Sequence, residues 1–287
     1  MEHMKKYGLV AVMGRPNTGK STLLNAIMNQ KVAITSPLPQ TTRKNVRVRY
    51  KEERCIIDFI DTPGIMDKVE DLMGKKINKE APRAMSGVDV IVCLVDISRP
   101  KNEEENKVIG IIRKSTAKKI LVYNKTDQAI GSKDHLAEYN YLEEEFDKVI
   151  AVSALKNKHV KGLINLILEY LPEKETDEID DDIQIPMGSN EYIGEIIREK
   201  VFLFMRREIP YSVTVEVEGV EEKKKILVIK ANILTNADRY KKMIIGKGGQ
   251  KIKEIGYNAR KELELMSGRK IFLELTVKID RHWEERL

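Results

Sequence analysis

The chain has 287 residues, of which 41% are hydrophobic and 33% charged, and its formal net charge is +6. This length exceeds the ~100 to 150 residues of a typical domain, so it predicts two domains. No apolar run approaches the ~20 residues that cross a bilayer. The two cysteines lie in apolar, strand-like runs, which argues against a disulfide framework. We therefore expect a soluble, cytoplasmic protein.

Charge divides the chain into three parts. Residues 1–172 carry 29 Lys and Arg against 22 Asp and Glu, residues 173–190 carry 1 against 7, and residues 191–287 carry 21 against 16. An acidic stretch with turn residues between two basic bodies is typical of a linker. We predict a first domain over 1–172, an acidic linker over 173–190 and a second domain over 191–287.

Short apolar runs alternate with helical patterns through the first predicted domain. The expected strands cover residues 7–13, 46–50, 55–60, 88–95, 120–123 and 149–152. Near-continuous apolar strands separated by helices predict an α/β fold with a mostly parallel sheet and helices on both faces. Such folds bind ligands beyond the carboxyl ends of the strands, so functional residues are expected there.

A glycine-rich segment, residues 14–21 (GRPNTGKS), joins the first predicted strand to a predicted helix. Backbone N–H groups at such a turn and helix start bind phosphates. Lys20 can reach the outer phosphates, which gives it a catalytic role, and the Ser21 hydroxyl can bind Mg²⁺. The residues assigned to nucleotide binding in this segment are Asn17, Thr18, Gly19, Lys20, Ser21 and Thr22.

The sequence Asp-Thr-Pro-Gly at residues 61–64 follows the third predicted strand. Asp61 can hold Mg²⁺, commonly through a water. The N–H group of Gly64 can contact a terminal phosphate, so we assign Gly64 a catalytic role. Taken alone this segment would be an ordinary turn, and the phosphate loop upstream favours the functional interpretation.

Two further elements are expected to hold the base. Residues 124–127 (Asn-Lys-Thr-Asp) place a carboxylate, Asp127, where it can accept hydrogen bonds from N1–H and the 2-amino group of guanine. Lys125 can lay its stem along the base, and the N–H group of Ala154 could reach the guanine carbonyl. The residues assigned here to nucleotide binding are Asn124, Lys125, Asp127, Ser153 and Ala154.

These four elements, in this order, resemble the G motifs of GTPases of the translation-factor class. The resemblance implies GTP and GDP as ligands, with Mg²⁺ held by Ser21, Asp61 and one switch threonine. Residues 40–43 (Gln-Thr-Thr-Arg) resemble the first switch, and we assign Thr42 to Mg²⁺ and catalysis, with Thr41 as the alternative.

Ile65, not glutamine, follows Gly64. A side chain without a polar group cannot orient the attacking water, so we expect slow unaided hydrolysis. The resemblance suggests K⁺ at Asn17 as an additional positive charge beside the phosphates.

The second predicted domain begins with a helix and two strands, followed by Gly-Lys-Gly-Gly at residues 246–249 and a long helix. Residues 234–261 hold eight Lys and Arg against two Asp and Glu. An ordinary glycine turn between helices is the alternative, but the flanking isoleucines and the basic density resemble the α+β KH module, which clamps single-stranded RNA. That resemblance assigns RNA contacts to Ile244, Ile245, Gly246, Lys247, Gly248, Gly249, Lys251 and Ile252, with Ile255 shaping the groove.

A G domain followed by one KH domain resembles the family of bacterial ribosome-assembly GTPases. This implies binding near the 3′ end of small-subunit ribosomal RNA, action on the pre-30S subunit, a monomeric state and partial peripheral association with the membrane. A metabolic P-loop kinase and an RNA-binding scaffold with a purely structural nucleotide are the alternatives.

Overall fold

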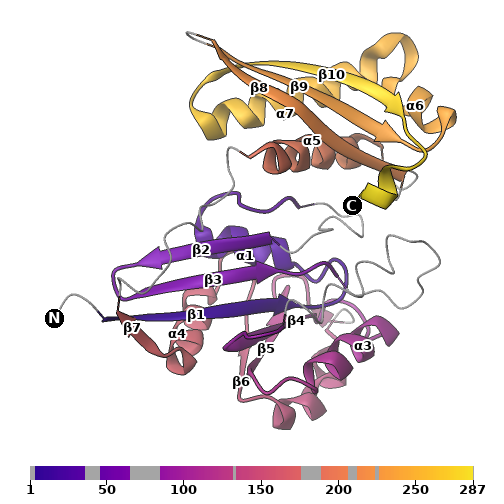
Figure 1. Ribbon diagram of the computed structural model, residues 1–287. Coiled ribbons are helices and arrows are strands. Elements are labelled where there is room, and N and C mark those ends of the chain that lie inside the picture. Colours follow the sequence, from indigo (N-terminus) through magenta and orange to yellow (C-terminus); the bar gives the residue numbers. More distant parts are fainter. Residues whose placement is uncertain are drawn as a thin grey trace. The chain divides into compact units, whose positions relative to one another are not determined.

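The computed structural model describes residues 4–35, 46–64, 85–131, 134–175, 189–205, 212–223 and 226–286. They form two compact units (Figure 1). The first comprises the described residues up to Ala33 and those from 46 to 175. The second comprises Ile34, Thr35 and the described residues from 189 onward. Of the predicted acidic linker, residues 176–188 lie outside the described residues.

The first unit is built on one sheet, and its strands in the described part of the chain are β1 (Met4–Met13), β2 (Val46–Glu52), β3 (Cys55–Asp61), β4 (Val90–Asp96), β5 (Lys118–Asn124), β6 (Lys148–Ala151) and β7 (Glu173–Glu175). The order is β2-β3-β1-β4-β5-β6, with β7 paired to the start of β1. Strands β1, β3, β4, β5 and β6 are parallel, and β2 and β7 are antiparallel to their neighbours. The expected mostly parallel sheet is confirmed.

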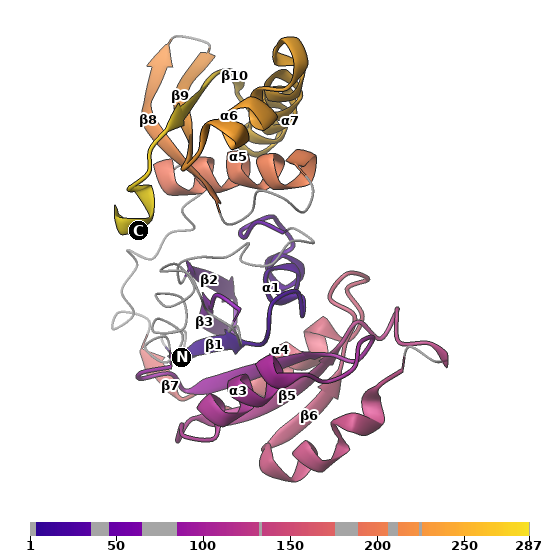
Figure 2. The ribbon, with the colours of Figure 1, turned by 90° about the vertical axis from the view of Figure 1, so that its right-hand side faces the viewer.

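Helices cover both faces of this sheet. On one face α1 (Lys20–Met28) and α4 (Val160–Tyr170) pack against Val10 and Val12, and on the other α3 (Glu103–Ile112) packs against Ala11 and Met13 (Figure 2). Successive strand residues point to opposite faces, so a segment buried on both faces is expected to be apolar, as residues 10–13 of β1 and 90–95 of β4 are. The turns η2 (Leu136–Glu138) and η3 (Asn140–Glu145) complete the second face.

The second unit is an α+β domain, as expected. Its elements in chain order are α5 (Asn190–Met205), β8 (Val213–Lys223), β9 (Ile226–Thr235), α6 (Asp238–Ile245), η7 (Lys247–Gly249), α7 (Gln250–Ser267), β10 (Lys270–Ile279) and η8 (Trp283–Arg286). The sheet order is β10-β9-β8, with β9 parallel to β10 and antiparallel to β8. The three helices lie on one face of the sheet, and Ile196, Ile244 and Ile255 bring them into one hydrophobic core with the sheet residue Ile233 (Figures 1 and 2).

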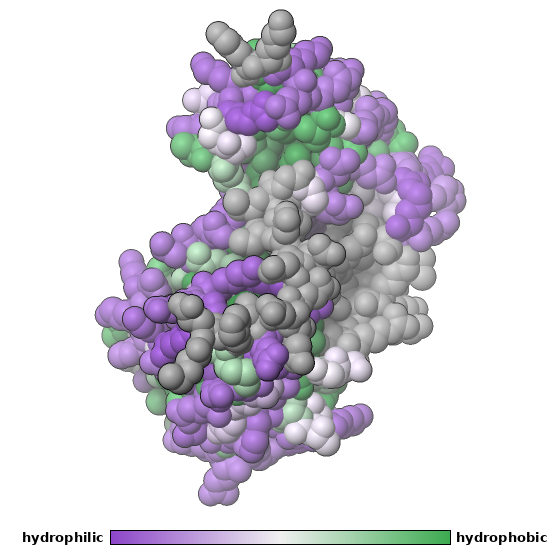
Figure 3. All heavy atoms as spheres, turned by 60° about the vertical axis from the view of Figure 1, so that its left-hand side comes forward, coloured by the Kyte–Doolittle hydropathy of each residue, from purple (hydrophilic) through white to green (hydrophobic). Residues whose placement is uncertain are grey.

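The visible surface of both units is mainly hydrophilic (Figure 3). In the space-filling view of Figure 3, hydrophilic side chains cover most of the coloured surface of each unit, with hydrophobic areas between them. Among the described helices, none combines the length and the apolar character needed to cross a membrane.

Candidate functional site

The loop between β1 and α1 is shaped by two glycines that cannot be replaced without a clash. A Cβ atom on Gly14 would lie 2.5 Å from the carbonyl oxygen of Leu94, and one on Gly19 would lie 2.4 Å from Nδ2 of Asn124. Gly19 also has a φ of 101°, which L side chains rarely adopt, and it is the N-cap of α1. The loop therefore curves tightly around the start of α1. The first N–H groups of this helix have no partner within the helix, so they can donate to a phosphate held inside the curve.

Lys20, the first residue of α1, lies inside this loop. Its Nζ donates to the carbonyl oxygens of Gly14 and Arg15, each at 2.9 Å, and the residue is only 6% exposed. Burial lowers the pKa of Lys20 to about 8, although the Asp61 carboxylate partly opposes the shift. When a nucleotide binds, phosphate oxygens can replace these two carbonyl oxygens as acceptors and form stronger, charge-assisted hydrogen bonds with the ammonium group.

This pKa predicts that nucleotide affinity falls as the pH rises. Below pH 8 the free protein carries the charged ammonium that phosphates need, whereas above pH 8 binding must first take up a proton. A pKa of about 8 leaves roughly one tenth of Lys20 charged at pH 9, so we expect GDP affinity to drop about tenfold between pH 7 and pH 9.

Calorimetric titration with GDP in buffers of different ionisation enthalpy checks this, because proton uptake should appear above pH 8. The Lys20→Met variant is the control and should lose this uptake. Equal proton uptake in both proteins would contradict the assignment to Lys20.

Two of the three predicted Mg²⁺ ligands, Ser21 and Asp61, lie side by side. The Ser21 hydroxyl donates to Oδ2 of Asp61 at 2.9 Å, and Asp61 is fully buried at the end of β3. A hydroxyl beside a carboxylate at the phosphate loop is a hard oxygen donor set of the kind Mg²⁺ uses, so these residues fit the ion. The Thr62 hydroxyl donates to the Val12 carbonyl at 2.7 Å and ties this loop to β1. Gly64 follows against the phosphate loop, where its Cβ would lie 2.7 Å from the Pro16 nitrogen.

Asn124 joins the phosphate loop to the base-side loops. Its Nδ2 donates to the Thr18 carbonyl at 2.8 Å, and its Oδ1 accepts from the Ala154 N–H group at 3.0 Å. The Ser153 hydroxyl donates to Oδ1 of Asp127 at 2.5 Å. In this structure the Ala154 N–H group thus donates to Asn124, whereas the sequence predicted that it would donate to the guanine carbonyl. The hydrogen bond from Ser153 fixes the orientation of the Asp127 carboxylate.

Residues 40–43 of the predicted first switch, with Thr41 and Thr42, and Ile65 lie outside the described residues. The structure places Asn17 in the phosphate loop with a φ of 63°, a conformation that asparagine tolerates better than most residues. Thr22 lies in the first turn of α1.

The second candidate site is the glycine turn between α6 and α7. Gly246, Gly248 and Gly249 all have positive φ values, of 71°, 57° and 74°. A Cβ on Gly246 would lie 2.7 Å from the Cβ of Lys251, whereas one on Gly248 would meet no atom within 4 Å. The turn is therefore tight at its start and open at its tip, so another backbone can approach it closely.

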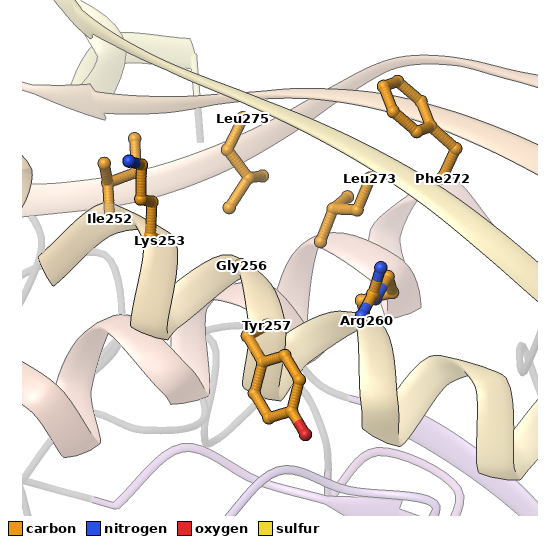
Figure 4. A pocket seen from close by; sticks show the side chains of 8 residues that line it. All are labelled: Ile252, Lys253, Gly256, Tyr257, Arg260, Phe272, Leu273 and Leu275. Atoms are coloured by element: carbon orange, nitrogen blue, oxygen red, sulfur yellow. The ribbon is translucent and has the colours of Figure 1, made fainter. Parts of the chain in front are cut away.

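A groove of about 360 Å³ lies between β10 and α7, the helix that follows this turn (Figure 4). Its lining residues are Ile252, Lys253, Gly256, Tyr257, Arg260, Phe272, Leu273 and Leu275. Gly256 places no side chain in the groove, and a Cβ there would come into contact with Leu275 at 3.4 Å. Apolar walls with basic groups at the rim suit a base and its phosphate.

The structure corrects one part of the predicted RNA contacts. Ile244 and Ile255 have no exposed surface and belong to the hydrophobic core of the second unit, so they support the turn and do not line a binding surface. Ile245, Lys251 and Ile252 are partly exposed, and Lys247 is exposed at the tip of the turn. Of the two adjacent isoleucines before the turn, Ile244 is therefore in the core and Ile245 is partly exposed at the surface.

Two family models match separate parts of the chain. A model of 50S ribosome-binding GTPases matches residues 9–125, and a KH domain model matches residues 208–284. GTPase Era of Clostridioides difficile is 38% identical over 98% of this chain and 95% of its own length. This chain belongs to the GTPase Era family. GTPase Era of Thermosipho melanesiensis is 39% identical over 98% of the chain and 94% of its own length.

Two solved Era structures agree with this fold over 98% of the chain and 96% of their own length, each with a TM-score of 0.88 and 34% identity. One is a tyrosine-to-alanine variant of Aquifex aeolicus Era bound to GDP·AlF₄⁻. The other is Era in complex with MgGDPNP and nucleotides 1506–1542 of 16S ribosomal RNA.

Sequence reasoning for this Era family member missed residues in both sites. Gly256, Leu273 and Leu275 line the groove, and only the apolar spacing of the last helix and strand pointed toward them. Asp96 was missed as well, although it pairs with the predicted base-side Lys125 at 2.7 Å. An aspartate that directly follows the apolar run of a predicted strand was the available signal.

Proposed function

We propose that this chain is a Mg²⁺-dependent GTPase that binds small-subunit ribosomal RNA near its 3′ end and assists maturation of the pre-30S subunit. The observation that carries the proposal is the pair of Asn124 hydrogen bonds, which link the phosphate loop to the segment holding Asp127 and Ser153. A guanine base and its phosphates would thus be held by one connected structure. The Era complex with MgGDPNP and 16S ribosomal RNA supports the RNA part.

In this proposal each part of the nucleotide site has a separate task. The first N–H groups of α1 and the Lys20 ammonium stabilise charge on the outer phosphates. Ser21 and Asp61, with Thr42, hold Mg²⁺, which neutralises phosphate charge when bound. Gly64 offers its N–H group to the terminal phosphate. Ile65 has no group that can orient water, so basal turnover is expected to be slow.

The proposal also makes the chain a switch. The contacts of Thr42 and Gly64 depend on the terminal phosphate, so the two loops have a different free energy in the GTP and GDP states. A difference of this kind can change how strongly the second unit holds RNA.

Multiple-turnover phosphate release by the full chain, with GTP or ATP and with or without a 3′-terminal 16S fragment, tests the function. We expect GTP turnover that competing ATP leaves unchanged, and saturable binding of the fragment. Equal competition by ATP would favour a metabolic kinase. RNA binding with no turnover would favour an assembly scaffold with a structural nucleotide.

We also propose that K⁺ binds near Asn17. Its positive charge beside the phosphates would assist hydrolysis, which Ile65 cannot do because it has no polar group to orient the attacking water. Turnover is then expected to be at least about tenfold faster in K⁺ than in Na⁺ at equal ionic strength, which corresponds to roughly 1.4 kcal/mol of barrier. The Asn17→Ala variant is expected to lose the difference. Identical turnover of the unaltered chain in both salts would contradict a K⁺ site.

Finally, we propose a cytoplasmic location with a fraction held peripherally at the inner face of the membrane. High-salt washing of a membrane fraction is expected to release the protein, because charge attraction is screened by salt. Protein that resists the wash would contradict a peripheral association.

A further inference from the structure

Asp96 is the last residue of β4 and has no exposed surface. In the sheet it lies directly beside Asn124, the residue that links the phosphate loop to the base-side loops. A carboxylate is rarely buried unless other groups compensate its charge, so its partners indicate its task.

Both oxygens of Asp96 have close partners in the loops around the nucleotide site. Oδ2 lies 2.7 Å from Nζ of Lys125 and 2.6 Å from Nε of Arg99. Oδ1 accepts from the hydroxyl of Ser98 at 2.6 Å and from its N–H group at 3.0 Å. Burial alone would raise the pKa of Asp96, but hydrogen bonds from Lys125 and Ser98 and the nearby cations outweigh it, and the pKa is lowered. The carboxylate is therefore charged at neutral pH and fully engaged.

The two cations on Oδ2 lead in two directions. Lys125 belongs to the base-side loop and has a φ of 65°, an unusual backbone conformation for lysine, so the anchored side chain helps to fix that loop. Arg99 extends toward the phosphate loop, where Nη2 lies 3.4 Å from the Pro16 carbonyl oxygen. Asp96 thus joins the loop that holds the base to the loop that holds the phosphates.

We propose that Asp96 is a positioning residue for nucleotide binding, which holds Lys125 and Arg99 so that both loops keep their relative placement. This inference rests on the proposed guanine-nucleotide site. It adds that the site is preassembled by a buried carboxylate outside the four sequence motifs. A preassembled site loses less conformational freedom when the nucleotide binds. Removing the Asp96 carboxylate should therefore appear mainly as faster release of the nucleotide.

Asp58→Asn is a matched control for Asp96→Asn. Asp58 is also fully buried in a strand of the same sheet and paired with an arginine, since Nε of Arg49 lies 2.7 Å from its Oδ1. Its other partners, Arg47 and Tyr7, lie on neighbouring strands and not in the nucleotide loops. Both variants remove one buried charge, but only one acts on the site.

The experiment measures dissociation of fluorescent GDP from the full chain together with the thermal unfolding midpoint. We expect Asp96→Asn to speed GDP release about tenfold, equivalent to one broken charged contact. Asp58→Asn should lower the thermal unfolding midpoint about as much as Asp96→Asn does. It should change the rate of GDP release by less than about twofold. Equal acceleration in both variants, or none in Asp96→Asn, would overturn the proposal. If the unaltered chain does not bind GDP, the proposed function itself fails.

Arg99→Gln keeps the proposal testable if Asp96→Asn does not fold, because 40% of the Arg99 side chain is exposed. This variant should also release GDP faster. A double variant, Asp96→Asn with Lys125→Met, adds a readout that a merely structural role would not give. If Asp96 acts partly through Lys125, the effects of the two substitutions on GDP release combine to less than their product, and fully multiplied effects would contradict that route.

Discussion

Replacing Asp127 by asparagine is expected to weaken GTP binding by about 10²- to 10⁴-fold and to create affinity for xanthosine triphosphate. The variant would lose the two charge-assisted hydrogen bonds that the Asp127 carboxylate accepts from guanine, each worth roughly 1.5 to 3 kcal/mol. The amide introduced by Asp127→Asn would instead offer an N–H donor to the 2-carbonyl group of xanthine. The hydroxyl of Ser153, which donates to Oδ1 of Asp127 at 2.5 Å, can keep the same bond to an amide oxygen. The side chain should therefore stay in place while its specificity changes.

Competition of GTP, ATP and xanthosine triphosphate against fluorescent GDP gives the measurement. Asp147→Asn is the control, because Asp147 directly precedes β6 and so lies at the opposite end of the sheet, where it pairs with Lys118 at 2.7 Å. This control should keep guanine preference. An Asp127→Asn variant with unaltered guanine preference would refute the assignment of the base-reading carboxylate.

The central strands of the first unit's sheet were predictable because their sequences are mostly apolar on both faces. The buried runs in β3, β4 and β5 identify strands from composition alone, and the G motifs follow their ends. The antiparallel direction of β2 follows from the two residues that join it to β3, because a parallel pair would need a crossover of about a dozen residues. Residues 173–175 carry charges typical of a linker and nevertheless form β7, because the edge of β1 at Met4–Lys6 offers them backbone partners.

The sites divide in a similar way. Backbone-dependent roles were predictable, since the glycines and Lys20 are fixed by what a phosphate loop requires. Roles that depend on which way a side chain points were not. Ile244 and Ile245 are adjacent in the sequence, but only the packed helix shows that the first is in the core and the second at the rim. Asp96 was missed because its partner Lys125 is distant in the sequence and meets it only through strand register.

Replacing Gly248 by aspartate is expected to reduce RNA affinity by about 10- to 100-fold, which corresponds to the loss of one charge-assisted contact of roughly 1.4 to 2.8 kcal/mol. Gly248 has a φ of 57°, a conformation that aspartate tolerates, and a Cβ there meets no atom within 4 Å. The fold should therefore accept the side chain. The new carboxylate would lie at the open tip of the turn, where it would repel the phosphates that Lys247 and its neighbours attract.

The helix that follows this turn provides a matched control in Gly268→Asp. Gly268 is the C-cap of α7 with a φ of 66°, and a Cβ there would meet no atom within 4 Å, so both the chemistry and the backbone conformation of the change are the same. Binding of a 3′-terminal 16S fragment at several salt concentrations should weaken for Gly248→Asp and stay within about twofold for Gly268→Asp. Gly248→Asn separates bulk from charge and should fall between the two, because it fills the tip without repelling phosphate. Equal losses in both aspartate variants would show that the glycine turn does not contact the RNA.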